Sequence, residues 1–304
     1  MLYYPSKAEL VHGIVQPLVD DVEVVLAGFA QLSLPRRARW RHDHRVIHVT
    51  ERGNGERAVF VHGSGSWATH DAFGFGAQLP LAEDFRLVLP DRRGYGGSPD
   101  VERSDYAQDA EDIAELLDGG AHLVGHSSGG VVALLAATRA PGSVRSLTLI
   151  EPACFQIAAD APLVAAALER NRAAVASVPP DLSDADLVRL NFESVGFEAP
   201  EPTPELARAT RTALNEFPAW EAQIPLDRLG AFPKLVITGT WEDAPQAYRE
   251  HGGEPIMECA RVSAERIGAE LLRVAGASHW PHSQRPDVVN AALREFWKAG
   301  ASRG

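Results

Sequence analysis

The sequence predicts an α/β fold in which a mostly parallel sheet is covered by helices on both faces. From about residue 44, short apolar runs alternate with longer segments of helical periodicity, as strands and helices do in such a sheet. Residues 152–230 interrupt this alternation with helical pieces that prolines separate. That interruption favours an α-helical cap inserted between two strands of the sheet.

The predicted strands begin with Arg45–Thr50, whose side chains alternate as in an exposed strand. The following strands are apolar runs: Ala58–Val61, Arg86–Pro90, Ala121–Val124, Val144–Ile150, Lys234–Thr238 and Glu270–Val274. Helical spacing predicts helices at Tyr106–Leu117, Gly129–Arg139, 255–268 and 286–298 in the sheet domain, and at Pro162–Ala174, Asp184–Glu193 and Pro204–Asn215 in the cap.

Three regions follow from this pattern. Residues 1–43 form an N-terminal extension, mostly apolar with helical spacing in places, which Pro35 and the basic run after it bring to an end. Residues 44–151 and 231–304 form the sheet domain, and residues 152–230 form the cap.

Composition excludes several classes of function. The 304 residues are 45% hydrophobic and carry a net charge of −12, so the chain lacks the basic footprint of a nucleic-acid binder and anionic membranes repel it. No signal peptide or apolar run of transmembrane length is found, and a cytoplasmic protein is expected. Two cysteines, Cys154 and Cys259, make neither a disulfide framework nor a four-ligand zinc site, and no metal or other cofactor is expected.

The motif that carries chemistry is Gly125-His126-Ser127-Ser128-Gly129, which follows a predicted strand and opens a predicted helix. A sharp strand-to-helix turn of this kind exposes the serine hydroxyl at the carboxyl edge of the sheet. The two glycines prevent side chains from colliding around the turn. Ser127 is therefore the candidate nucleophile.

A serine hydroxyl needs a base, and His279 is the best candidate because it follows the last predicted strand and so lies at the same edge of the sheet. His282 is its competitor, and His62 and His126 are interpreted as packing or hydrogen-bonding residues. The backbone N–H groups of Ser64 and Ser128 are the expected donors to the oxyanion that serine attack generates.

These motifs stand in the order of the α/β-hydrolase family, which the chain resembles over about 44–300: HGSGS, DRRGYGGS, GHSSG, a helical cap and GASHWPH. The resemblance implies a doubly wound sheet and a Ser–acid–His triad. The family's common acid position follows the strand after the cap, where Glu242 and Asp243 stand here. A minority of members use a glutamate after the preceding strand, where Glu151 stands.

Glu151 is the preferred acid. Its surroundings, together with Phe217–Leu226, resemble a bacterial subgroup in which the later strand often ends without a carboxylate. Glu242 and Asp243 remain alternatives. The expected activity is hydrolysis of a carboxylic ester or lactone through an acyl-enzyme. A carbon–carbon hydrolase, a haloperoxidase-like enzyme and a hydroxynitrile lyase share this triad, and a non-enzymatic ligand-binding protein is the rival from another class.

The expected partner is a small, apolar, uncharged ester or lactone. Neither nucleic acid nor a membrane is expected as a partner, and a homodimer is left open.

Overall fold

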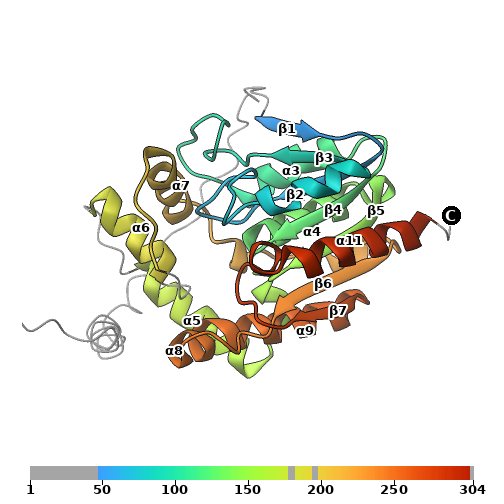
Figure 1. Ribbon diagram of the computed structural model, residues 1–304. Coiled ribbons are helices and arrows are strands. Elements are labelled where there is room, and N and C mark those ends of the chain that lie inside the picture. Colours follow the sequence, from blue (N-terminus) through green and yellow to red (C-terminus); the bar gives the residue numbers. More distant parts are fainter. Residues whose placement is uncertain (1–46, 177–181, 194–197, 302–304) are drawn as a thin grey trace, which may run out of the picture. The chain divides into compact units, whose positions relative to one another are not determined.

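The computed structural model describes residues 47–176, 182–193 and 198–301 (Figure 1). The chain divides into two compact units, Met1–Arg45 with Glu169–Pro180 and Val46–Leu168 with Asp181–Gly304. Of the first unit only the end of helix α5 (Pro162–Ala176) is described. The predicted extension over 1–43 lies outside the described residues.

The second unit contains a seven-stranded sheet in the order β1-β3-β2-β4-β5-β6-β7. Strand β1 pairs antiparallel with β3, and every other pair is parallel. The parallel strands therefore present their carboxyl ends at one edge. The strands are β1 (Val49–Arg52), β2 (Glu56–Val61), β3 (Phe85–Pro90), β4 (Ala121–His126), β5 (Val144–Ile150), β6 (Lys234–Gly239) and β7 (Glu270–Val274).

The strand order reverses direction between β2 and β4, because β3 lies outside β2 while β5, β6 and β7 follow β4 on the other side. Loops that leave neighbouring strands at such a switch point diverge to opposite faces and leave a crevice between them. Ser64 follows β2 and Ser127 follows β4, so the topology brings these two sequence-predicted site residues to the same crevice.

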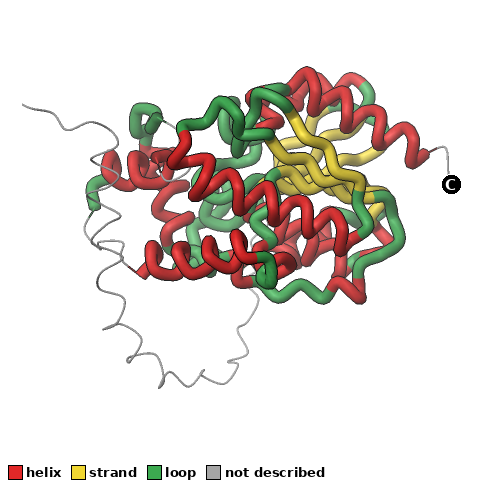
Figure 2. The backbone as a smooth tube through the Cα atoms, turned by 90° about the horizontal axis from the view of Figure 1, so that it is seen from below, coloured by secondary structure: helices red, strands yellow, loops and turns green. Residues whose placement is uncertain are grey.

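Both faces of the sheet are apolar and covered. On β2, Val59 and Val61 face a cluster containing helices α3, α4 and α9, whereas Ala58 and Phe60 face a cluster containing α11. Helices accordingly lie on both sides of the strands in Figure 2. This arrangement confirms the predicted α/β class with a mostly parallel, doubly covered sheet.

The helices include every predicted one, to within a few residues at each end, and two short ones, over 246–248 and 281–284, that the sequence did not predict. The helices are α3 (Tyr106–Leu116), α4 (Ser128–Arg139), α5 (Pro162–Ala176), α6 (Asp184–Glu193), α7 (Pro204–Leu214), α8 (Gln246–Tyr248), α9 (Glu254–Ile267), α10 (Pro281–Gln284) and α11 (Pro286–Ala301). The sequence analysis missed the 3₁₀ segment Gly76–Glu83, which contains Pro80 and has no helical periodicity in its apolar residues.

Local chemistry explains where several of these helices start and stop. Asp105 caps α3 by accepting a hydrogen bond from the Ala107 amide, and Thr203 caps α7 through the Leu206 amide. Helix α9 ends at Gly268, which adopts the left-handed conformation that a helix terminus favours. Among the described helices, none has the length and apolar character needed to cross a bilayer.

Helices α5, α6 and α7 lie in the segment between β5 and β6, and residues 152–230 are called the insertion below.

Candidate active site

Ser127 stands at the turn between β4 and α4 with φ of 55° and ψ of −124°, a conformation that costs a non-glycine residue about 1–3 kcal/mol. The turn needs its two glycines because a Cβ on Gly125 would lie 2.5 Å from the Gly129 carbonyl oxygen. A Cβ on Gly129 would lie 2.3 Å from the carbonyl oxygen of Val61. The backbone thus holds Ser127 at the carboxyl edge of the sheet, as the motif predicted.

His279 follows β7 and meets Ser127 across the edge of the sheet. Its Nε2 lies 3.2 Å from the Ser127 hydroxyl oxygen, and the residue is 8% exposed. The buried ring of His126 lies behind it, with Nε2 2.8 Å from the His279 carbonyl oxygen. Because a carbonyl only accepts, Nε2 of His126 donates this bond and anchors the loop of the candidate base.

Glu151 is fully buried at the end of β5, where its backbone has φ of 46°. One carboxylate oxygen, Oε2, lies 3.7 Å from Nδ1 of His279. The other, Oε1, accepts hydrogen bonds of 2.6 Å from the Thr238 hydroxyl and 2.6 Å from the Gly239 amide. Trp241 Nε1 donates to Oε2 at 3.2 Å. The carboxylate is therefore held from both sides and faces the histidine.

Glu242 and Asp243 are placed differently. Both are exposed, and the Glu242 carboxylate accepts a hydrogen bond of 2.9 Å from the amide of Gly276. Among the described interactions, neither carboxylate contacts His279. Of the three acids that the sequence left open, the structure brings Glu151 alone to the histidine.

Ser127, Glu151 and Trp241 are the non-glycine residues with positive φ in the described part of the chain. They follow three neighbouring strands, β4, β5 and β6, and each contributes to the same cluster. Strained backbone commonly collects where a site demands a particular side-chain direction. The strain therefore marks this corner of the sheet independently of any sequence motif.

The predicted oxyanion donors Ser64 and Ser128 lie together. Their hydroxyl oxygens are 2.7 Å apart, although the residues follow β2 and β4 respectively. Within the described residues, the backbone N–H groups of Ser64 and Ser128 have no hydrogen-bond acceptor. Ser128 is also the first residue of α4, where the helix dipole favours negative charge.

A buried ionic cluster that sequence reasoning missed lies beside these serines. Arg92 donates to Asp109 at 2.8 Å, to the Ser128 hydroxyl at 3.2 Å and to Glu216 at 2.9 Å. Burial raises the pKa of Asp109 to about 6, although Arg92 lowers it. Burial lowers the pKa of Arg92, but Asp109 and Glu216 outweigh it and leave that pKa raised. Arg92 belonged to the predicted DRRGYGGS loop, whereas Glu216 carried no motif that could have identified it.

Two buried histidines, His126 and His282, lie near His279, and a third, His62, lies beside Arg92. Burial, followed by the charge of Arg92, lowers the pKa of His62 to about 4. Burial, followed by repulsion from His279, lowers the pKa of His282 to about 3, and burial lowers the pKa of His126 as well. His282 packs on His126 with ring centroids 4.5 Å apart, so it supports the site from behind and does not compete as the base.

Aromatic side chains next to His279 join the sheet domain to the insertion. Trp280 and Phe73 have ring centroids 5.0 Å apart, and Phe73 lies 4.5 Å from Phe192 of α6. These rings share an apolar cluster with Val188 and Leu206 of the insertion. Apolar surface therefore lies directly beside the candidate base.

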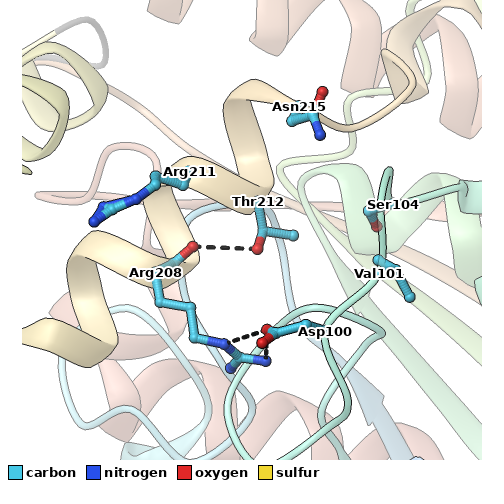
Figure 3. A pocket seen from close by; sticks show the side chains of 7 residues that line it. All are labelled: Asp100, Val101, Ser104, Arg208, Arg211, Thr212 and Asn215. Atoms are coloured by element: carbon cyan, nitrogen blue, oxygen red, sulfur yellow. Dashed lines mark hydrogen bonds and ion pairs between the residues drawn. The ribbon is translucent and has the colours of Figure 1, made fainter. Parts of the chain in front are cut away.

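Residues of the insertion and of the sheet domain together line a pocket of about 340 Å³ (Figure 3). Arg208 of α7 donates to Asp100 at 2.7 Å across it, and Thr212 and Asn215 line the same side. Ser104 lines the opposite side with a buried hydroxyl that has no partner among the described residues. Among the residues that the structure describes, no three His, Cys, Asp or Glu side chains are arranged to bind a metal.

Curated proteins and solved structures that resemble this chain include esterases and hydrolases. A Pimeloyl-(acyl-carrier protein) methyl ester esterase of Nitrosomonas europaea is 38% identical over 117 residues, which are 38% of this chain and 45% of that protein. The chain thus matches less than half the length of that relative. A 2-(acetamidomethylene)succinate hydrolase of Mesorhizobium japonicum is 27% identical over 271 residues, covering 83% of this chain and 91% of the relative.

Among solved structures, a thermophilic esterase from Thermogutta terrifontis superposes with a TM-score of 0.61 at 23% identity, covering 84% of this chain and 93% of the esterase. At that identity the likeness concerns the fold. The model of the alpha/beta hydrolase family matches residues 58–292, which include strands β3 to β7, most of β2 and the site residues described above. Since this match covers well over half of the sequence, the chain belongs to the alpha/beta hydrolase family.

Proposed function

We propose that the chain is a serine hydrolase that cleaves a carboxylic ester or lactone through an acyl-enzyme. The observation that carries the proposal is the continuous contact from the Ser127 hydroxyl to His279 Nε2 and from His279 Nδ1 to Glu151. A nucleophile, a base and a group that orients the base are the three parts that such chemistry requires.

In the proposed reaction, Ser127 attacks the substrate carbonyl while its proton passes to Nε2 of His279. The imidazolium that forms is stabilised by Glu151, and the 3.7 Å separation between them shortens as the charge develops. The oxyanion binds the free amides of Ser64 and Ser128. His279 then protonates the departing alcohol oxygen. Water, activated by the same histidine, attacks the acyl group and releases Ser127.

The aromatic cluster around Trp280 supports a substrate with an apolar group next to the reacting carbonyl. The esterase name of the Nitrosomonas relative supports an ester as the scissile bond, although the match covers less than half of that protein.

Hydrolysis of short-chain p-nitrophenyl esters and simple lactones tests the proposal. We expect Ser127→Ala to lower kcat/KM for any accepted substrate by about 10⁴-fold or more. Ser104→Ala is the matched control, because that buried hydroxyl has no partner among the described residues and lies at the Figure 3 pocket. Wild-type protein that hydrolyses none of these substrates and whose Ser127 resists fluorophosphonate labelling would point to a ligand-binding protein instead.

A further inference from the structure

Glu216 is a nearly buried carboxylate of the insertion that reaches into the sheet domain. It follows α7, and its side chain is 7% exposed. Oε2 accepts hydrogen bonds from Arg92 at 2.9 Å and from the Tyr95 hydroxyl at 2.8 Å. Oε1 accepts a hydrogen bond from the hydroxyl of Ser64. A carboxylate with this many donors is fixed in place.

The hydrogen bonds around Glu216 close into a ring in which each donor and each acceptor can be assigned. Arg92 can only donate, so the Ser128 hydroxyl accepts from it at 3.2 Å. Since Ser64 gives its proton to Glu216, Ser128 must donate across the 2.7 Å contact to Ser64. Donation therefore runs from Arg92 through Ser128 and Ser64 to Glu216, and Arg92 closes the ring by donating directly to Glu216 as well.

This ring joins the two loops that carry the proposed oxyanion donors. Ser64 follows β2 and Ser128 begins α4, and their side chains are held together by the ring while their backbone N–H groups stay without an acceptor among the described residues. Stabilisation of an oxyanion depends on donors that are already in place, and small displacements of a positioned group lower rates strongly.

We propose that Glu216 is a positioning residue that fixes the spacing of the Ser64 and Ser128 amides through the Arg92–Ser128–Ser64–Glu216 ring. The insertion therefore contributes one residue, Glu216, to the ring that positions the two oxyanion-hole amides. This inference rests on the proposed serine hydrolase function and adds a residue that touches neither the substrate nor the triad.

The test combines Glu216→Gln, Ser64→Ala and the double variant, with kcat and KM measured on an ester that the wild type accepts. Affinity for a trifluoromethyl ketone, which forms an anionic adduct with the serine, is measured in parallel. We expect each single variant to lower kcat about 10–30-fold and to leave KM within about twofold of the wild-type value. The affinity for the ketone should fall by a factor similar to that of kcat. Ser64→Ala keeps the backbone amide, so it isolates the side chain's part in the ring.

Because both residues act through one ring, the double variant should lose no more than the more damaged single variant. Asp100→Asn is the control: it breaks the Arg208 ion pair between α7 and the sheet domain, away from the ring (Figure 3). We expect its kcat and ketone affinity to stay within about twofold of wild type.

Three results overturn the inference. The first is a Glu216→Gln variant that keeps the wild-type kcat and ketone affinity. The second is a double variant whose loss of kcat equals the product of the two single losses. The third is an Asp100→Asn variant that loses as much kcat as Glu216→Gln does. If the wild type hydrolyses no ester and binds no ketone, the proposed function itself is contradicted. If the wild type is active and Glu216→Gln is as active as the wild type, only the positioning role is contradicted.

Discussion

Two polar clusters flank Ser127, and they are built in different ways. On one side, His279 and Glu151 are held by groups at the ends of neighbouring strands, such as Thr238 at the end of β6. On the other side, Ser64 and Ser128 are held by Arg92 and by Glu216, which comes from the insertion. The hydrogen bonds that hold the first cluster come from the sheet domain, whereas those that hold the second come from the sheet domain and the insertion.

This difference assigns different tasks to the two clusters. In the proposed mechanism, the cluster of His279 and Glu151 accepts the proton of Ser127, and the backbone of Ser127 and Glu151 is strained at this edge of the sheet. The cluster of Arg92 and Glu216 contacts neither Ser127 nor His279 among the described interactions. Its proposed task is to position the amides of Ser64 and Ser128. An alteration in the insertion should therefore affect transition-state stabilisation more than proton transfer.

The largest predicted effect separates the two buried glutamates. Glu151→Gln removes the charge that stabilises the His279 imidazolium, and we expect kcat to fall by about 10⁴-fold. Glu216→Gln should lower kcat by only about 10–30-fold. Steady-state hydrolysis of one ester by both variants makes the comparison. Equal losses would mean that the two clusters do not have separate tasks.

A smaller effect is predicted for Thr238→Val, which removes the 2.6 Å hydrogen bond to Glu151 while the Gly239 amide still binds the same oxygen. We expect kcat to fall about tenfold, the cost of a hydrogen bond to a charged group. Thr148→Val in the adjacent strand β5 is the control, because the buried Thr148 hydroxyl has no partner among the described residues. Its kcat should be unchanged, and a loss as large as that of Thr238→Val would contradict this role.

The smallest effect concerns stability and pH. The pKa of His62 is lowered to about 4 and that of His282 to about 3, first of all by burial. Below about pH 6.5 the unfolded chain therefore binds protons that the folded chain does not, and stability is lost as the pH falls toward these values. Asp109, whose pKa burial raises to about 6, opposes this trend between about pH 6 and 4.

These two histidines outweigh one aspartate, and burial also lowers the pKa of His122, to about 4, and that of His126. The net loss between pH 7.5 and pH 5 is therefore at least on the order of 2 kcal/mol. Thermal unfolding should show Tm lower by about 5 °C at pH 5. His282→Leu should make the decline shallower. A Tm that does not change between these pH values, or a decline that His282→Leu leaves as steep, would contradict the assignment of neutral buried histidines.

The contrast between the clusters also explains what the sequence could predict. Ser127 and His279 lie at strand ends that apolar runs reveal, and the parallel sheet brings such ends together. Glu151 could be proposed in the same way and preferred over Glu242 through a resemblance, but the hydrogen bonds from Thr238 and Trp241 that hold its buried carboxylate could not be predicted. These tertiary contacts support the choice of Glu151 independently of the resemblance.

Glu216 could not be predicted, because its role depends on the packing of the insertion against the loop of Arg92, which lies 124 residues earlier in the chain. No periodicity or spacing in the sequence encodes such a contact. Likewise, the 3₁₀ segment Gly76–Glu83 has no repeating apolar face, and its position is set by packing, as the buried Gln78 shows by donating to Asn290 and to the His282 carbonyl.

The central claim is that Glu151 completes the triad of Ser127 and His279. Single-turnover acylation of the enzyme by an activated ester tests it most directly, because it isolates the step in which His279 accepts the Ser127 proton. We predict that Glu151→Gln lowers the acylation rate by several orders of magnitude, while Glu242→Gln retains nearly the full rate. The opposite result, a near-normal rate in Glu151→Gln and a collapse in Glu242→Gln, would contradict the account.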